Sequence, residues 1–592
     1  MNFETLFTFA LLVATVYLFV SERLRVDLVA LLALAALAVT GVLEPEAALA
    51  GFANPATVTI AALFILSAAL LRAGAGQLAG QVMVSLFSRG QWLGLALLMV
   101  GVGAISAFIN NTAAVAMLMP VVLGVCGKIG TSPSKLLMPL SFASMFGGVC
   151  TLIGTSTNLL VSQIAVEHGA RPFGMFEFAP LGLVFFALGV GYMLTLGDRL
   201  LPERREADDL TTTFEMADYL TDVVLDEDAA SAGVRLDRAP VVRELDLDVL
   251  EVRREGRRVS LPRGETMLLP GDVLRVRSTL EGIRELAQRE DVSLAPTVRW
   301  RDEELDTADI LLLEVVIPTG SALAGTSLER SGFRNTFGAT VLAIRRRGKV
   351  VHDQLKKVPL APGDSLLLEV RRSRLAPLRS SRDLIIVSEG ELAEFRRDKL
   401  VASSLILAAV VATAALGIFP IVVSALAGCV ALVLTRCLSL EEAYAAVDWR
   451  IVFLLAGVLG LGRALEGTGG AALLSDLVVG WLAPLGPVAV LAGLYLLTSL
   501  LTEAMSNNAT AVLLAPVAIA TAELLGVDSR PFLMAVTFAA SASFMTPVGY
   551  QTNTLVYGPG RYRFSDYTRV GLPLNLLFWL AATLLIPRIW PF

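Results

Sequence analysis

Two short polar stretches interrupt long apolar runs, and they decide the fold of this chain. Residues 106–112 read Ser-Ala-Phe-Ile-Asn-Asn-Thr, and residues 502–508 read Thr-Glu-Ala-Met-Ser-Asn-Asn. Each stretch carries a hydroxyl four residues before its polar tip, so one helical turn brings the hydroxyl oxygen to the same face as the tip. A lipid-facing helix does not tolerate such interruptions. We therefore predict two re-entrant helical hairpins, over about 91–127 and 484–524.

The two stretches belong to halves of the chain that repeat each other. Like residues recur 395 or 396 positions apart in three pairs: Asn111 and Asn507, Pro120 and Pro516, Gly154 and Gly549. Each half also has apolar stretches long enough for five membrane crossings of roughly 20 residues. Because five is an odd number, the two halves would cross the membrane in opposite directions. Inverted repeats of this kind are the plan of many secondary transporters.

The composition is that of a polytopic membrane protein in a lipid bilayer. Hydrophobic residues make up 55% of the 592 positions and charged residues 17%. The four cysteines lack the spacing of a disulfide framework or a zinc site, and two histidines are too few for such chemistry. Charges of both signs are mixed through one central block, whereas a nucleic-acid reader shows a basic patch. We predict a transporter that is not an enzyme and has no nucleic-acid partner.

Loop cations predict the orientation. Residues 201–399 hold most of the charged residues. If this central block is cytoplasmic, the clear exceptions to the positive-inside rule are only Arg171, Arg530 and Arg588. The first hairpin then enters from the cytoplasm and the second from the exterior. We expect a multi-pass plasma membrane protein, in a bacterium an inner membrane protein.

A broken helix is expected opposite each hairpin tip, because one tip supplies too few oxygens for a cation. Glycine or proline interrupts the apolar spans at 153–158 and 546–554. Carbonyl groups freed at such breaks suit a cation, and helix amino ends suit an anion. Hard oxygen ligands fit sodium better than a soft transition metal. The alternative is that Asn, Ser and Thr only join helices by hydrogen bonds, but the matched recurrence favours a site.

Glu503 is the intramembrane carboxylate nearest a tip. Buried ionisable groups in membranes are candidates for function, and proton coupling is one role for this side chain. The other is a structural carboxylate that accepts hydrogen bonds from a neighbouring helix.

The paired tips resemble the Ser-Asn-Thr signatures of the divalent anion:sodium symporter family, within the wider ion transporter superfamily. The resemblance covers both apolar halves, about two thirds of the chain. It implies two sodium sites, one formed by Ser106, Asn110, Asn111 and Gly154, the other by Thr502, Met505 through its carbonyl, Asn507 and Gly549. It implies that the anion meets residues of both tips and both unwound helices: Asn110, Asn111, Thr112, Ser506, Asn507, Asn508, Thr155 and Tyr550.

The sequence departs from the family pattern in ways that bear on the substrate. Asn110 stands where the family has Ser, and Asn508 where it has Thr. The unwound loops read Gly-Thr-Ser-Thr-Asn and Gly-Tyr-Gln-Thr-Asn, where dicarboxylate carriers usually have Thr-Pro-Pro-Asn. Family members with a similar central insertion are often assigned to sulfate, and the tips lack an Arg or Lys pair for two separated carboxylates.

We therefore favour a sodium-coupled symporter of sulfate or another compact oxyanion that works by alternating access. The runner-up is a C4-dicarboxylate/sodium symporter. A proton-coupled or exchange-type anion carrier is a further alternative. A regulated channel or membrane sensor is the alternative from a different functional class.

The central block reads as two copies of a β-rich module. Strand-like alternation covers residues 241–252 and 339–346, and Pro-Gly-Asp occurs at 270–272 and again 92 positions later. Each copy resembles the C-terminal module (RCK-C) of potassium-transport regulators, an α+β fold that commonly dimerises. A homodimer, a structural dimerisation role and a small-ligand effector are all compatible with this resemblance. The predicted order is a first membrane repeat, two regulatory domains and a second membrane repeat: 1–200, 201–302, 303–398 and 399–592.

Overall fold

The computed structural model describes most of the chain: residues 3–21, 24–74, 90–129, 131–204, 397–473 and 483–592, Phe87, Ser475, and most of 220–294 and 310–387. The chain forms two compact units. The helical unit consists of Met1–Glu203 and Gly390–Phe592, and the central unit of Arg204–Glu389.

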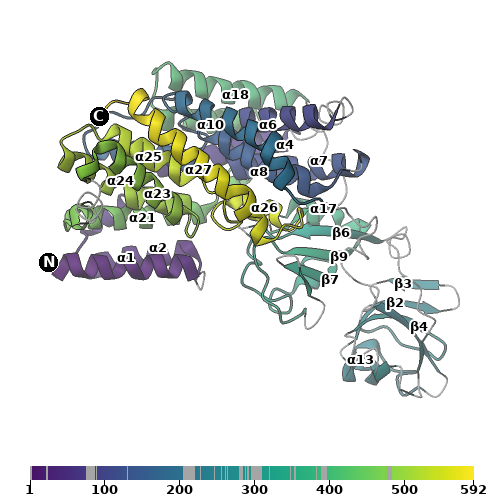
Figure 1. Cartoon of the computed structure of the whole chain (residues 1–592). Helices are drawn as coiled ribbons and strands as arrows, with labels where there is room; N and C mark the ends of the chain where they lie inside the picture. Colours follow the sequence, from purple (N-terminus) through teal and green to yellow (C-terminus); the bar gives the residue numbers. More distant parts are fainter. Residues whose placement is uncertain are drawn as a thin grey trace. The chain divides into compact units, whose positions relative to one another are not determined.

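The helices of the two halves of the helical unit follow in the same order (Figure 1). The first half contains α1 (Phe3–Ser21), α2 (Val26–Val39), α3 (Pro45–Leu49), α4 (Pro55–Arg72), α6 (Gln91–Ser106), α7 (Asn111–Ile129), α8 (Pro133–Gly148), α9 (Ser156–Glu167), α10 (Ala179–Tyr192) and α11 (Asp198–Leu200). The second contains α18 (Arg397–Ala415), α19 (Ile421–Leu434), α20 (Leu440–Ala446), α21 (Trp449–Gly467), α23 (Pro487–Thr502), α24 (Asn507–Leu525), α25 (Arg530–Ser541), α26 (Gln551–Tyr557) and α27 (Phe564–Ile589).

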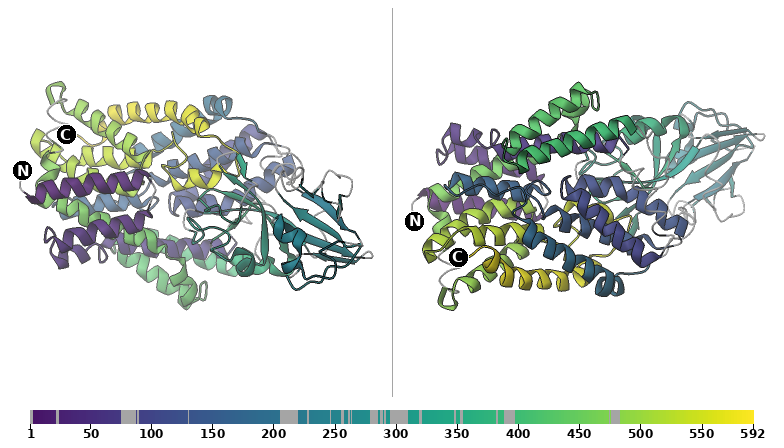
Figure 2. Two further views of the ribbon diagram at one scale, coloured as in Figure 1. Left: turned by 90° about the horizontal axis from the view of Figure 1, so that it is seen from below. Right: turned by 90° about the horizontal axis from the view of Figure 1, so that it is seen from above.

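The packing of these helices recurs as well. Helix α6 packs on α8, and α23 packs on α25; α2 of the first half packs on α21 of the second, and α19 packs on α4. The two further views show segments from the two ends of the chain, purple to blue and green to yellow, side by side in one bundle (Figure 2). The halves are therefore interleaved.

Several helices have the length and apolarity of membrane spans. Among the described residues, five helices satisfy both criteria: Pro55–Arg72, Ala179–Leu200, Asp398–Ala415, Asn507–Leu525 and Phe564–Ile589. Six more apolar helices have 10–17 residues. Two of these shorter helices, α6 and α23, are the first arms of the predicted hairpins.

Phenylalanine side chains from both halves form one core. Phe142 and Phe146 of α8 lie on Phe544, with ring centroids 4.9 and 5.4 Å apart, and Phe185 of α10 stacks on Phe578 of α27 at 4.2 Å. All five are almost fully buried. Such ring pairs add stabilisation beyond the area they bury, so this core fixes the two halves to each other beside the site described below.

The central unit contains two antiparallel sheets with the same strand order, β3-β2-β4-β1-β5 and β8-β7-β9-β6-β10. The strands of the first are β1 (Leu220–Leu225), β2 (Asp248–Arg254), β3 (Arg257–Ser260), β4 (Val273–Arg277) and β5 (Val292–Leu294). Those of the second are β6 (Ile310–Val316), β7 (Ala339–Arg346), β8 (Lys349–Val351), β9 (Ser365–Arg371) and β10 (Ile385–Ile386). Short helices accompany them: α13 (Pro240–Glu244), α16 (Phe333–Phe337) and α17 (Leu375–Ser380).

The strand predicted over 339–346 is confirmed, because β7 has these bounds. The strand predicted over 241–252 is wrong in its first part. Pro240–Glu244 forms α13, and β2 begins only at Asp248. Proline at the first helical turn loses no hydrogen bond and has a helical φ, and this local preference prevails over the apolar alternation.

The repeated Pro-Gly-Asp turn is held by the same ion pair in both sheets. The turn glycines have φ values of +79° and +82°, a region that favours glycine. Buried Asp272 accepts from Arg254 Nε at 2.7 Å, and buried Asp364 accepts from Arg346 Nε at 2.8 Å. Each turn is therefore anchored to the strand beside it.

The two sheets also contact each other. Arg277 of β4 donates to the carbonyl oxygens of Val341 and Leu342 in β7, at 2.9 and 2.6 Å. The position that corresponds to Arg277, 92 residues later, is Glu369. Burial raises the pKa of Glu369 to about 8, the charge of Glu251 acts in the same direction, and nearby arginines oppose the shift.

Candidate functional site

Each predicted hairpin is a pair of helices joined by a four-residue break. Helix α6 ends at Ser106 and α7 begins at Asn111; α23 ends at Thr502 and α24 begins at Asn507. The paired residues meet across each break. Ser106 Oγ lies 2.5 Å from the Asn111 side chain, and Thr502 Oγ1 lies 3.2 Å from Asn507 Oδ1. All four side chains are buried.

Asn110 and Ser506 shape the second arm of each hairpin. Asn110 Oδ1 accepts from the backbone N–H of Thr112 at 2.9 Å, and Ser506 Oγ accepts from that of Ala509 at 3.4 Å. Short polar side chains favour this position because they satisfy N–H groups that the helix leaves unpaired. These two predicted site residues therefore start α7 and α24.

The helix breaks predicted opposite the tips are present. Helix α8 ends at Gly148 and α9 begins at Ser156; α25 ends at Ser541 and α26 begins at Gln551. Between each pair of helices the backbone is irregular and carries one of the two predicted glycines, Gly154 or Gly549.

A threonine side chain joins each irregular segment to the hairpin of its own half by hydrogen bonds, and we call this pair of bonds a threonine hook. Thr151 Oγ1 donates to the carbonyl oxygen of Ala107 and accepts from Gly154 N–H at 3.1 Å. Thr546 Oγ1 donates to the carbonyl oxygen of Glu503 at 3.0 Å and accepts from the N–H of Gly549 at 3.0 Å. The two hooks are equivalent because the threonines are 395 positions apart.

Asparagines close the same segments. Asn158 Nδ2 donates to the Thr151 carbonyl oxygen at 2.7 Å, and Asn553 Nδ2 donates to that of Thr546 at 3.2 Å. Both halves therefore contain the pattern Thr-x-x-Gly-x-x-x-Asn. This pattern is readable in the sequence, and it could have revealed the hooks in advance.

Glycine is required at both predicted positions by close backbone approach. A Cβ atom on Gly154 would lie 2.9 Å from the Ala107 carbonyl oxygen and closer still to that of Gly148. A Cβ atom on Gly549 would lie 2.9 Å from the Thr502 carbonyl oxygen and would overlap Ser543 Oγ. Each irregular segment thus passes directly beside the end of the first hairpin helix.

Oxygen atoms converge on Asn111. One atom of its amide lies 2.5 Å from the Tyr550 hydroxyl. The other faces three oxygens, Ser106 Oγ at 2.5 Å and the carbonyl oxygens of Ser144 at 3.1 Å and Gly154 at 3.3 Å. Hydrogen bonding alone favours the amide nitrogen toward these three, whereas a cation among them favours the amide oxygen. Four hard oxygens in this arrangement suit a cation such as sodium.

The second half has a corresponding set. Thr502 Oγ1 donates to the carbonyl oxygen of Ala540 at 2.8 Å, and Ala540 corresponds to Ser144 because it lies 396 positions later. The sequence reasoning missed both residues, since a carbonyl oxygen is common to every residue type. The side chain of Met505, predicted to act through its carbonyl, lines an apolar cavity of about 300 Å³ with residues of α1 and α24.

The tips also bond across the halves. Thr112 Oγ1 donates to Gln551 Oε1 at 3.0 Å, and Ser156 Oγ donates to Asn508 Oδ1 at 2.7 Å. These two bonds join corresponding positions of the two halves, because Asn508 lies 396 residues after Thr112 and Gln551 lies 395 residues after Ser156. Each tip therefore contacts the helix start that follows the unwound segment of the opposite half.

Two predicted anion-site residues lie just before those helix starts. Thr155 precedes α9, where its Oγ1 accepts from Thr157 N–H at 3.4 Å, and Tyr550 precedes α26. Both are buried. The structure thus brings together Thr112, Asn508, Thr155 and Tyr550 with the tips, and the sequence reasoning missed Ser156 and Gln551.

Glu503 accepts hydrogen bonds from three groups. Its carboxylate accepts from Met545 N–H at 3.0 Å, Ser543 Oγ at 3.1 Å and Asn575 Nδ2 at 2.9 Å. These contacts are those expected of a structural carboxylate, the second of the two roles considered for Glu503. The corresponding residue of the first half is Ala107.

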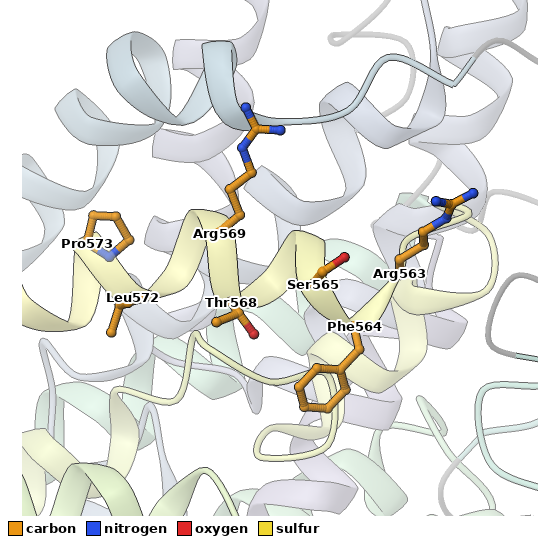
Figure 3. A pocket seen from close by; sticks show the side chains of 7 residues that line it. All are labelled: Arg563, Phe564, Ser565, Thr568, Arg569, Leu572 and Pro573. Atoms are coloured by element: carbon orange, nitrogen blue, oxygen red, sulfur yellow. The ribbon is translucent and has the colours of Figure 1, made fainter.

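A further cavity contains none of the tip or unwound-segment residues. A wide, shallow cavity lies on the first turns of α27 and is lined by Arg563, Phe564, Ser565, Thr568, Arg569, Leu572 and Pro573 (Figure 3). Among the described residues, no group of three His, Cys, Asp or Glu side chains could hold a metal ion. The tips and unwound segments remain the candidate site.

Comparison with known proteins decides the family. The model of the citrate transporter family (CitMHS) matches residues 16–531. The chain belongs to this citrate transporter family. It is therefore a transporter, and its apolar helices are those of a multi-pass membrane protein.

Relatives match over nearly the whole chain. An uncharacterized transporter of Synechocystis sp. is 38% identical over 599 residues, covering 100% of this chain and 98% of the relative. The uncharacterized transporter YfbS of Escherichia coli is 33% identical over 617 residues, covering 100% of both. Sodium/sulfate cotransporter 1 of Chlamydomonas reinhardtii is 22% identical over 745 residues, covering 90% of this chain and 84% of the relative.

Proposed function

We propose that this chain is a sodium-coupled symporter of a small divalent anion, with sulfate as the favoured substrate. The observation that carries the proposal is the recurrence of one constellation in both halves. In each, a hydroxyl and an asparagine at a helix break lie beside the carbonyl oxygen of a facing broken helix. Hydrogen bonds that only join helices do not require the same set of groups in both halves, so the recurrence supports a binding site.

The proposed sodium sites use these two constellations. The first comprises Ser106, Asn110, Asn111 and Gly154, with the Ser144 carbonyl oxygen added. The second comprises Thr502, Met505, Asn507 and Gly549, with the Ala540 carbonyl oxygen added. Sodium at either site would also neutralise the carbonyl ends of α6 and α23, which point into the breaks.

The proposed anion site lies between the tips. Helices α7, α9 and α24 begin at residues that bond to one another or to the opposite unwound segment. Helix amino ends carry unpaired N–H groups and partial positive charge, which suit an anion. The side chains in these contacts are hydroxyls and amides, so sodium would supply the full positive charge that the anion needs.

Sulfate is favoured over a carboxylate by two observations. The relative from Chlamydomonas reinhardtii is named a sodium/sulfate cotransporter. The unwound loops also differ from the Thr-Pro-Pro-Asn of dicarboxylate carriers. The family is described as citrate transporters, so carboxylates are the competing class of substrate. Every uptake test should therefore include a carboxylate.

We further propose that the halves are inverted repeats with re-entrant hairpins opening from opposite sides, which would give alternating access. The central unit is proposed to be cytoplasmic, with two RCK-C-like modules. Their identical strand order and the shared ion pair at the Pro-Gly-Asp turn support one module in two copies. Homodimerisation and an effector are proposals that rest on the resemblance of these modules alone.

Reconstituted vesicles test the transport proposal. Purified protein in proteoliposomes should accumulate radiolabelled sulfate when a sodium gradient is imposed, and not when choline replaces sodium. A pH gradient imposed without sodium is the second arm. Uptake that follows the pH gradient and ignores sodium would replace the symporter by a proton-coupled carrier, and exchange requiring internal sulfate would indicate an antiporter.

A further inference from the structure

Thr155 and Tyr550 hold corresponding positions, 395 residues apart, directly before α9 and α26. Their backbones are almost identical, with φ and ψ of −135° and 143° for Thr155 and −131° and 136° for Tyr550. The difference between the halves here is therefore one of side-chain size. A small hydroxyl stands on one side and a phenol on the other.

The phenol crosses from its own half to the other. The Tyr550 hydroxyl accepts a hydrogen bond from the Asn111 amide nitrogen at 2.5 Å, and Asn111 belongs to the hairpin of the first half. The side chain is only 9% exposed. The ring is therefore fixed by its own backbone at one end and by Asn111 at the other, and it fills space between the second unwound segment and the first tip.

We propose that Tyr550 is the size-selecting residue of the anion site, and that it limits the substrate to a compact tetrahedral oxyanion. This inference rests on the proposed function. A sulfate-sized anion can accept from the phenol hydroxyl while the ring stays in place. A dicarboxylate, whose charges are separated by methylene groups, would have to displace the ring.

Displacement of the ring would be costly for two reasons. The ring has few rotamers, and Tyr550 is buried. Moving the hydroxyl would also leave the Asn111 amide without its cross-half partner in a buried place, and a site built around a polar contact discriminates strongly against ligands that break it. Thr155 is too short to impose the same limit from the first half.

The competing interpretation is that Tyr550 only joins the halves. The two interpretations differ in what a smaller side chain does. A purely structural tyrosine predicts that its removal lowers stability and slows transport of every anion equally. A size-selecting tyrosine predicts that its removal changes the ratio between anions.

Three variants separate these outcomes. Tyr550→Thr installs the side chain that the first half already carries, and Tyr550→Phe removes the hydroxyl but keeps the ring. Tyr557→Phe is the matched control, because Tyr557 is a buried tyrosine at the other end of α26. Sodium-driven uptake of radiolabelled sulfate and succinate is measured for each in proteoliposomes, with folding checked by size-exclusion chromatography.

We expect wild type and Tyr557→Phe to prefer sulfate strongly. In Tyr550→Thr the ratio of succinate to sulfate uptake should rise by about tenfold or more, while Tyr550→Phe should keep the preference and bind sulfate less tightly. An unchanged ratio in a sodium-dependent Tyr550→Thr protein contradicts the inference. If Tyr550→Thr does not fold, a competition experiment with the wild-type protein decides. Unlabelled succinate that inhibits uptake of radiolabelled sulfate as strongly as unlabelled sulfate does would contradict the inference.

Failure of the proposed function has a different signature. A wild-type protein without sodium-driven uptake of either anion contradicts the symport proposal and the size inference with it. A wild-type protein with sodium-driven uptake of both anions at equal rates contradicts only the size inference.

Discussion

The first and second tips share a backbone plan and differ in most of their side chains. Both have the hydroxyl and asparagine across a helix break, the threonine hook and the close-approach glycine. Among the differences, Glu503 of the second half corresponds to Ala107, and Tyr550 corresponds to Thr155. The shared features hold backbone oxygens in place, as the proposed sodium sites require. The two differences fall at a carboxylate that fixes the second tip and at the residue proposed to select the anion by size.

The largest effect is expected from substitutions of the asparagines that both tips share. Asn111→Ala and Asn507→Ala each remove one amide from a proposed sodium site, and sodium-driven sulfate uptake should fall by about 100-fold or more in either variant. The matched control is Asn335→Ala, an exposed asparagine of the central unit. Uptake that survives in both tip variants would mean that the asparagines only join helices.

The glycines test whether the two backbones are equally constrained. Gly154→Ala and Gly549→Ala should each destabilise the protein by about 3 kcal/mol, because the added Cβ overlaps backbone or a buried hydroxyl. Thermal unfolding in detergent measures this. Gly101→Ala is the control, since a Cβ at that helical glycine meets no atom within 4 Å. Equal melting temperatures for Gly101→Ala and Gly154→Ala would disprove the close approach.

Glu503→Ala gives the second tip the side chain that the first tip carries at the corresponding position, Ala107. The substitution leaves Met545 N–H and Asn575 Nδ2 without their acceptor, and it should lower stability by about 2 kcal/mol. Its transport phenotype sharpens the comparison. Retained sodium dependence with reduced stability identifies a structural carboxylate, whereas uptake that no longer responds to pH in a stable protein would point to proton coupling.

The smallest expected effect concerns a difference between the two modules of the central unit. Arg277 of the first module corresponds to Glu369 of the second. Burial raises the pKa of Glu369 to about 8 in the folded state, above about 4.3 in an unfolded chain. The folded state therefore binds the extra proton between these values, and stability falls as pH rises through this window.

Between pH 7 and 8 the loss should be about 1 kcal/mol. Glu369→Gln, which is neutral at every pH, should flatten this slope in thermal unfolding followed by tryptophan fluorescence or circular dichroism. Glu329→Gln, at an exposed position of the same module, is the control. A slope that is the same in wild type and Glu369→Gln would show that this carboxyl is not responsible.

The sequence predicted those parts of the candidate site that recur in both halves and that depend on particular side chains. The helix breaks beside Asn111 and Asn507 were visible because polar residues and glycines interrupt apolar runs at a fixed offset. The carbonyl oxygens of Ser144 and Ala540 were not, because any residue can supply them. The bond from Tyr550 to Asn111 was also hidden, since it joins residues of different halves whose approach depends on the whole helix packing.

In the central unit, local patterns were sufficient for β7 and misleading for α13. The alternation around Val241 resembles a strand, but Pro240 starts a helical turn, and in this five-residue segment the proline decides the structure more than the hydrophobic period does. The equal strand order of the two sheets depends on pairing between distant strands, which no single segment encodes.

The dependence of anion binding on sodium tests the two-tip site most directly. Sulfate should raise the melting temperature of the purified protein by mass action. If sodium at the tips supplies the positive charge for the anion, sulfate should raise the melting temperature in sodium chloride and have no effect in choline chloride at equal ionic strength. Equal stabilisation by sulfate in both salts would contradict a site that sodium completes.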